Sequence, residues 1–388
     1  MTVDTRHVRP VEPDIFQGRP KPANYAKLRR RCGRRPERRI EFMESSVYMP
    51  AESTEDNVRA WLKVLSRYRQ PRIGRSGFEL LVTVVPFAAF WACASISLFQ
   101  GFWLGLISVV PASAFLLRLF MIQHDCGHGS FFARRRLDDW TGRAIGVLTL
   151  TPYDYWRRAH AAHHASAGNL DERGTGDITT LTVAEYRSLP RLKRLGYRLY
   201  RHPLVMFGIG PAWLFVFKQR LPFGMMADGP LPWISTMATN LAITALALAM
   251  IWAVGPVPFL AIHLPIVTLA GAAGVWLFYV QHQFEETHWS KGKAWRFAEA
   301  ALHGASHYDL PPALRWITGN IGIHHVHHLS SRIPYYRLPE VLRDHPQLAD
   351  IGRITLWESL QCVRLVLWDE TRGKLISFRE ASEATSNP

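Results

Sequence analysis

Two long apolar runs decide the fold: residues 78–99 read FELLVTVVPFAAFWACASISLF, and residues 101–122 read GFWLGLISVVPASAFLLRLFMI. A second pair follows at 234–254 (ISTMATNLAITALALAMIWAV) and 257–281 (VPFLAIHLPIVTLAGAAGVWLFYVQ). Each run has about 20 residues, enough for a helix to cross a hydrocarbon core of about 30 Å. Helical hairpins buried in a soluble core are the alternative, but four nearly uncharged runs of this length are rarely all core. The sequence therefore predicts an all-α, polytopic membrane protein with four transmembrane helices in two hairpins.

The distribution of charge predicts how the spans are oriented. The chain has a net charge of +15 and a pI of about 10.0, so it needs an anionic neighbour, either nucleic acid or a membrane face. The aromatic content of 12 % and the apolar runs favour the membrane. The first 77 residues contain 18 Lys and Arg, whereas the hairpin turns near 100 and 255 contain none. By the positive-inside rule, both termini and residues 123–233 lie in the cytoplasm.

The spans divide the chain into three predicted regions. These are a basic cytosolic N-terminal region (1–77), a membrane domain (78–345) and a cytosolic C-terminal region (346–388). Two apolar segments, 142–152 and 203–217, are too short to span, and we predict interfacial or re-entrant helices there. Arg118 lies in the last turn of the second run, and we expect its side chain to snorkel to the membrane interface.

Histidines are concentrated in three short windows. The windows are HDCGH at 124–128, HAAHH at 160–164 and HHVHH at 324–328. Nine of the 17 histidines stand there, and all of them except His325 are at offsets of i, i+4 or i, i+3, i+4, which place side chains on one helix face, one turn apart. A lone histidine is more often a hydrogen-bonded core residue than a ligand, but three such windows predict metal binding. An even number of spans separates the windows, so all three can converge on one site beside the membrane.

Ligand chemistry alone leaves the metal open. Eight imidazoles exceed the four ligands of one tetrahedral zinc and suit two metals with open positions. Imidazole binds iron, zinc, copper and nickel alike, so a dizinc hydrolase stays possible on these grounds. A membrane metal-binding or transport protein would carry ionisable residues inside its spans, and these spans carry almost none. The four cysteines are scattered without the paired spacing of a disulfide framework or a zinc ribbon.

The windows and their surroundings resemble a known family. They match the HxxxH, HxxHH and HxxHH boxes of the membrane fatty-acid desaturase and hydroxylase superfamily. The similarity runs from about 78 to 345 and is greatest to omega-6 (delta-12-like) acyl-lipid desaturases. It includes HDCGHGSFF at 124–132, TPYDYWRRAHAAHHASAGNLDERGTGDI at 151–178 and GNIGIHHVHHLSSRIPYYRLPE at 319–340. The resemblance implies a cofactor of two iron ions (a di-iron centre), dioxygen as co-substrate, and a cytosolic helical cap on a four-helix membrane stem.

The resemblance also assigns residues. The implied metal ligands are His124, His128, His160, His163, His164, His282, His324, His327 and His328. Of these, His282 matches a ligand that the family often has after its last span, with His288 as the alternative at this place. Metal-bound imidazoles usually donate their other N–H to a carboxylate, a carbonyl or water. We therefore expect Asp125, Asp177 and His325 to surround the ligands rather than to bind metal.

The implied activity is oxygen-dependent desaturation of a lipid-linked acyl chain. An unactivated methylene has no acidic proton and no leaving group, so acid–base catalysis cannot attack it, whereas a redox metal can. A fatty-acyl or other lipid hydroxylase on the same di-iron scaffold is the alternative. The HPGG haem motif of a fused cytochrome b5 is absent from the sequence. We therefore expect the membrane as surroundings, a separate ferredoxin or cytochrome b5 type donor with its reductase as partner, and no nucleic acid.

Overall fold

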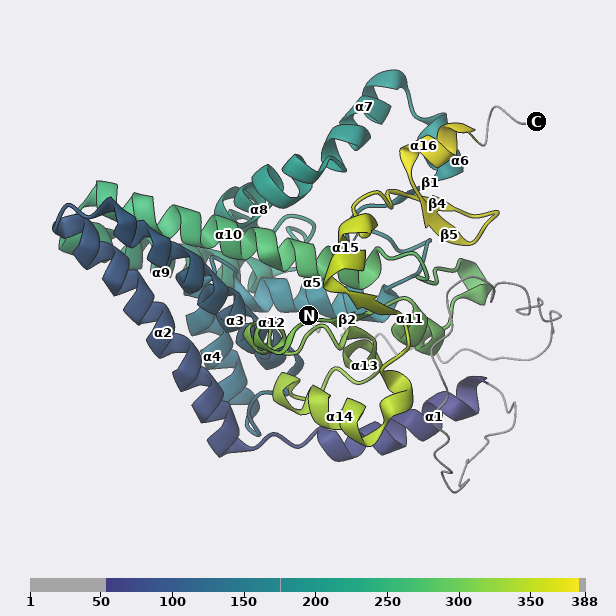
Figure 1. Cartoon of the computed structure of the whole chain (residues 1–388), viewed down its shortest axis with the longest axis horizontal. Helices are drawn as coiled ribbons and strands as arrows, with labels where there is room; N and C mark the ends of the chain where they lie inside the picture. The colour runs from purple at the N-terminus through teal and green to yellow at the C-terminus, as the bar shows by residue number, and fades with distance from the viewer. Residues whose placement is uncertain (1–53, 175, 384–388) are drawn as a thin grey trace, which may run out of the picture. The chain divides into compact units, whose positions relative to one another are not determined.

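The computed structural model describes residues 54–174 and 176–383. Within them, four helices are long and apolar enough to cross a membrane, which confirms the predicted helical architecture with four spans. The spans are Ile73–Phe99 (α2), Trp103–His128, Pro230–Val254 (α9) and Pro256–His282 (α10). The second span begins with the turn Trp103–Ser108 and continues as α3 (Val109–His128) (Figure 1). Because α3 and α10 extend beyond the apolar runs, both carry histidines at their C-terminal ends.

The other helices are short. In chain order they are α1 (Thr54–Leu65), α4 (Arg135–Leu148), α5 (Tyr153–Ser166), α6 (Val183–Ser188), α7 (Arg191–Tyr200), α8 (Gly210–Ala212), α11 (Phe297–His303), α12 (Pro312–Ile317), α13 (His324–Leu329), α14 (Leu338–Asp344), α15 (Leu356–Cys362) and α16 (Phe378–Glu383). Single helical turns occur at Ser66–Tyr68, Lys218–Arg220, Gly292–Ala294, Tyr335–Arg337 and Pro346–Leu348. The second and third histidine windows lie on α5 and α13.

Five short strands supplement the helices. They are β1 (Leu181–Thr182), β2 (His307–Asp309), β3 (Arg353–Thr355), β4 (Leu367–Asp369) and β5 (Lys374–Ile376). Strand β4 pairs in parallel with β1 and antiparallel with β5, and β2 pairs in parallel with β3. In the second sheet His307 is in register with Arg353. Strands of two or three residues have too few positions for an alternating pattern, so the sequence gives no sign of them.

The membrane hairpins pack together around α3. Both α2 and α10 lie along α3, and α4 packs against it (Figure 1). Gly129 ends α3 one residue after His128 with φ +68°, and a Cβ there would lie 2.6 Å from the Arg135 guanidinium. Gly255, with φ +86°, alone separates α9 from α10, which begins at Pro256. These two glycines fix where the spans end and where the chain reverses.

Arg118 does not reach the membrane interface, so the prediction that it snorkels was wrong. Its side chain is 1 % exposed and pairs with Glu79 of α2, which is also 1 % exposed. The Arg118 Nε donates to Thr83 Oγ1 at 3.2 Å, and Nη1 donates to the Trp316 carbonyl. Because the partner stands 39 residues earlier, on the opposite helix of the hairpin, no local pattern reveals the pair.

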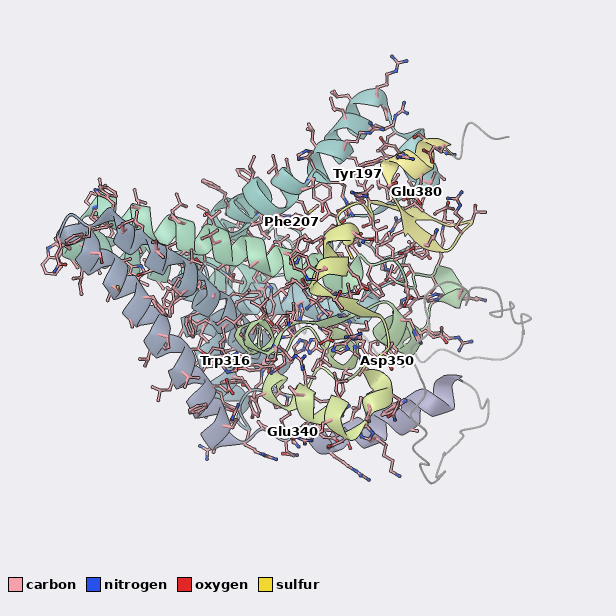
Figure 2. The ribbon with its side chains drawn as sticks, viewed as in Figure 1. Tyr197, Phe207, Trp316, Glu340, Asp350 and Glu380 are labelled. Carbon is pink, nitrogen blue, oxygen red and sulfur yellow. The ribbon has the colours of Figure 1, made fainter. Side chains whose placement is uncertain are left out.

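The segment predicted at 203–217 is helical. It consists of α8 between two π-helical turns, Val205–Ile209 and Trp213–Phe217, and it packs along α10. The Phe207 ring contacts Tyr279 of α10 with ring centroids 5.3 Å apart (Figure 2). Gly271 of α10 leaves room for Phe215, whose ring would lie 2.9 Å from an added Cβ. The segment predicted at 142–152 is formed by the end of α4 and the turn after it.

Candidate metal centre

Four helices bring nine histidines together. The end of α3 carries His124 and His128, and α10 ends on His282. The remaining six come from α5 and α13: His160, His163, His164, His324, His327 and His328. The main buried core includes Ile122 of α3, Val280 of α10 and Val326 of α13, so packing holds the ends of these helices together.

The nine histidines form two groups, within each of which the candidate ligand nitrogens all lie within 4.8 Å of one another. The five-histidine group comprises His124, His128, His160, His164 and His327. The four-histidine group comprises His163, His282, His324 and His328. From α5, the i, i+4 pair His160 and His164 belongs to the five-histidine group, and His163 belongs to the four-histidine group. In α13 the assignment is reversed: the i, i+4 pair belongs to the four-histidine group and His327 to the five-histidine group. The groups adjoin, because the rings of His164 and His328 stack with centroids 4.1 Å apart.

The Nε2 atoms converge within each group. In the five-histidine group, Nε2 of His160 lies 3.0 Å from that of His128 and 3.1 Å from that of His164. In the four-histidine group, Nε2 of His282 lies 3.1 Å from Nε2 of both His163 and His324. An Nε2–H group can donate to only one neighbouring Nε2 atom, so hydrogen bonds cannot satisfy all of these nitrogens at once. Converging lone pairs of this kind fit a bound cation.

The spacing of the nitrogens also tests which cation geometry fits. Two nitrogens at right angles on a metal at about 2.1 Å lie about 3.0 Å apart, whereas tetrahedral angles give about 3.4 Å. The measured Nε2 separations between neighbours are 3.0–3.2 Å. Five donors in one group also exceed the four of a tetrahedral site. The five-histidine group therefore fits an ion with more than four positions, and the four-histidine group offers four nitrogens to a second ion.

Carboxylates and carbonyls hold the outer nitrogens of several rings. Asp177 accepts a hydrogen bond from His163 Nδ1, and the Gly304 carbonyl accepts one from His282 Nδ1 at 3.2 Å. Asp125 Oδ1 lies 3.3 Å from His124 Nδ1, and its Oδ2 accepts the backbone N–H of Tyr335 at 2.6 Å. An imidazole that donates from Nδ1 presents a lone pair at Nε2, so these contacts aim the rings inward.

Burial keeps five of the histidines on α5 and α13 neutral. It lowers the pKa of His160 and His164 on α5 well below the usual value, and neighbouring imidazoles lower it further. Burial and neighbouring imidazoles also hold the pKa values of the α13 residues His324, His327 and His328 well below that value. Neutral rings at physiological pH can act as metal ligands without first losing a proton.

Other predicted residues stand apart from both groups. His325 is fully buried and donates to the Leu348 carbonyl at 2.8 Å. Within residues 54–174 and 176–383 its side chain forms no hydrogen bond with any of the nine histidines. His288 and His303 are exposed, and His307 donates from Nδ1 to the Ala349 carbonyl at 2.6 Å. The structure thus groups His282, and not His288, with the box histidines.

An apolar cavity of about 700 Å³ adjoins both groups. His124, His160 and His324 line it at one place, and Trp156 stacks on His160 with centroids 4.7 Å apart. Its other walls come from α3, the segment 205–218 and α10, where Gly274 faces it. These walls were not predicted from the sequence, where the glycines among the bulky residues of α10 are the one signal for them. A second, small pocket beside the four-histidine group is lined by residues that include His163, Asp177 and Trp289.

Fold and site together define an integral membrane protein whose buried histidines are arranged as metal ligands are. Residues 100–359 match the family model described as fatty acid desaturase. The fatty acid desaturase of Bacillus subtilis (strain 168) is 44 % identical over 317 residues, which cover 82 % of this chain and 90 % of that protein. The chain therefore belongs to the fatty acid desaturase family and is an oxidoreductase, as the histidine boxes predicted.

More distant relatives have more specific names. The sn-1 acyl-lipid omega-3 desaturase (ferredoxin) of Synechocystis sp. is 27 % identical over 282 residues, covering 69 % of this chain and 74 % of that protein. The sn-1 oleoyl-lipid 12-desaturase of the same organism is 25 % identical over 321 residues, covering 78 % and 81 %. Because one of these relatives is named as an omega-3 desaturase and the other as a 12-desaturase, the predicted similarity to the omega-6 branch stays a prediction.

Proposed function

We propose that this chain is an oxygen-dependent di-iron desaturase that introduces a double bond into a lipid-linked acyl chain. The observation that carries the proposal is the apolar cavity, which meets both histidine groups where His124, His160 and His324 line its wall. A volume of about 700 Å³ is in the usual range of ligand sites, about 300–1,000 Å³. The five- and four-histidine groups would each hold one iron.

The protein positions the acyl chain and excludes water from the reacting carbons. Bound iron would supply the redox chemistry that an unactivated methylene requires. Phe120 and Trp156 line the cavity beside the histidines and pack edge to face with centroids 5.3 Å apart. Such walls hold an extended hydrocarbon chain by dispersion and keep water from the reacting carbons. Overall, two hydrogens leave adjacent carbons, and one O2 becomes two waters with two electrons and two protons from outside.

Iron is favoured over zinc by the ligand set. Zinc prefers four tetrahedral ligands, whereas the five-histidine group offers five nitrogens. A dizinc hydrolase would also need a polar site for its substrate, and the adjoining cavity is apolar. Elemental analysis of active enzyme checks this assignment: about two irons per chain are expected, and zinc in their place would contradict it.

A separate electron donor of the ferredoxin or cytochrome b5 type, with its reductase, would supply the electrons. One relative is named as a ferredoxin enzyme, and the net charge of +15 on this chain favours an acidic donor. Donor-dependent turnover should therefore fall as ionic strength rises. Turnover that does not respond to salt would contradict electrostatic attraction of the donor.

The proposed placement has both termini and the histidine groups on the cytoplasmic side. Its support is the excess of Lys and Arg before residue 78 together with the uncharged hairpin turns. We retain the regions 1–77, 78–345 and 346–388 as proposed divisions of the chain. Labelling of introduced cysteines in intact cells tests the placement: Thr371→Cys should react only after the cells are opened. Reaction from outside would invert the topology.

Product analysis tests the activity. The chain is expressed in a bacterial host that lacks the reaction and has a compatible donor, and its fatty acids are analysed by mass spectrometry. His163→Ala and His282→Ala should abolish the new unsaturated product, whereas the exposed His288→Ala should retain it. A hydroxylated product would make the enzyme a hydroxylase, and full activity of His282→Ala would remove that residue from the ligand set.

A further inference from the structure

Helix α7 presents an apolar stripe to its surroundings. Its sequence is RLKRLGYRLY, and its Leu192, Leu195 and Leu199 are 80 %, 53 % and 55 % exposed. The spacing i, i+3, i+7 places the three leucines on one face of the helix. The opposite face holds Tyr197, which is buried and donates to the Val366 carbonyl at 2.6 Å (Figure 2). The leucines therefore point away from the body of the protein.

Basic residues flank the stripe. Arg191, Lys193, Arg194 and Arg198 stand on this helix, which contains no acidic residue. Arg198 is turned toward the protein, because its Nε donates to Tyr186 Oη at 2.7 Å. Arg191 and Lys193 are exposed, and neither forms an ion pair with any residue in the described ranges 54–174 and 176–383. The face thus combines exposed leucines with unpaired cations.

The apolar stripe continues along the chain to the cavity. Leu204, Ile209 and Trp213 are 73 %, 68 % and 59 % exposed. Ile209 and Trp213 also line the apolar cavity, as does Tyr200 at the end of α7. The chain leads from α7 into the turn 205–209 and α8, which lie beside the span α10 (Figure 1). The exposed stripe is therefore followed directly in the chain by residues that line the cavity.

We propose that α7 lies in the membrane interface and binds anionic phospholipids at the rim of the cavity. Three leucines in line would enter the boundary of the acyl chains, while Arg191 and Lys193 would reach the phosphates. A bilayer is the occupant that the charges favour, because an amphipathic helix with a basic flank is attracted to anionic lipid by about fivefold per cation. Continuity with the membrane-facing segment 205–217 supports the same occupant. The proposal rests on the bilayer and not on the chemistry of the histidine groups.

Fluorescent labelling tests the depth of α7. An environment-sensitive dye is attached to Leu195→Cys in full-length protein whose Cys32 and Cys93 are replaced by serine; Cys126 and Cys362 are buried. The protein is placed in bilayers of phosphatidylcholine with or without phosphatidylglycerol, which carry nitroxide-labelled lipids. Matched labels at Leu248→Cys, 62 % exposed on α9, and at Thr371→Cys, exposed in the turn before β5, report a membrane and a water position.

We expect lipid nitroxides to quench the label at position 195, as they quench the label at 248, and more strongly with phosphatidylglycerol. Adding Arg191→Gln and Lys193→Gln should weaken the phosphatidylglycerol effect by roughly 20-fold or more, at about fivefold per cation. A label that behaves as at position 371 would overturn the proposal. A shielded label without lipid quenching, together with crosslinking between chains, would also overturn it and assign the face to a second copy.

The result does not depend on turnover. His163→Ala protein should give the same quenching, so failure of the proposed desaturation leaves this test intact. Conversely, an active enzyme whose label at position 195 stays in water would refute the role of α7 alone. Leu199→Cys provides a second exposed position on the same stripe if the first variant is poorly produced.

Discussion

Replacing Arg118 with methionine should strongly destabilise the protein. The Arg118 guanidinium is held by Glu79, Thr83 and the Trp316 carbonyl, and it lies over the Trp316 ring at 4.0 Å. Without it, the buried Glu79 carboxylate would keep only Arg75, which is 49 % exposed, and the hydroxyl of Tyr335 at 3.1 Å. Breaking a buried pair in this way costs about 3–5 kcal/mol of unfolding free energy, because one charge is left without its partner.

A double-mutant cycle separates the pair from its surroundings. Replacing both Arg118 and Glu79 with methionine removes both charges and fills similar volume, so it should recover at least half of the loss. The exposed pair of Arg353 and Asp309 provides the control, and Arg353→Met should cost about 1 kcal/mol or less. Denaturant unfolding in one detergent, followed by tryptophan fluorescence, measures each variant.

Two results would refute this reasoning. The first is a loss of unfolding free energy in Arg118→Met that is no larger than the loss in Arg353→Met. The second is a loss in the double variant that equals the sum of the losses in Arg118→Met and Glu79→Met. The cycle also bears on the metal centre, since Trp316 and Tyr335 stand on either side of the third histidine window and Tyr335 N–H binds Asp125. We therefore expect the single variant, but not the control, to bind less metal.

Three further predictions address the site directly. Asp177→Asn should weaken metal binding at the four-histidine group by about 10–100-fold in a metal titration, whereas Asp171→Asn, whose side chain accepts the Gly292 N–H, should not. Gly274→Leu should block the cavity and shift products to shorter chains by mass spectrometry, while Leu at the open position Gly208 should not. Burial raises the pKa of Asp138 to about 7, so its contribution to stability is full below about pH 4 and is lost as pH rises through 7. Unfolding of Asp138→Asn between pH 5 and 8 should lack this loss, and an unchanged pH dependence would exclude Asp138 as its source.

Length and periodicity were sufficient to predict the spans. An apolar run of about 20 residues has one stable state in a bilayer, so the four helices follow from the sequence, with ends that agree to within six residues. The spacing within the histidine windows likewise predicted that side chains gather on one helix face. It could not predict which residue joins which group, because on a helix the i+4 side chain is rotated by about 40° from i, and the i+3 side chain by about 60° in the opposite direction.

Long-range contacts account for what the sequence did not predict. Arg118 seemed a candidate for snorkelling because its partner Glu79 lies on another helix. The walls of the cavity at 205–218 were missed because their function arises only where they face α10. The short strands β1 and β4 pair residues 181 and 367, which no local pattern connects.

Helices α5 and α13 each contribute histidines to both groups, and this links the two groups to each other. Each helix gives a pair of histidines to one group and a single histidine to the other, so neither group can form unless both helices are docked. The neutral nitrogens that converge at 3.0–3.2 Å repel one another without a cation between them. Free energy released on metal binding therefore also holds α3, α5, α10 and α13 together, and the metal centre is part of what stabilises the fold around it.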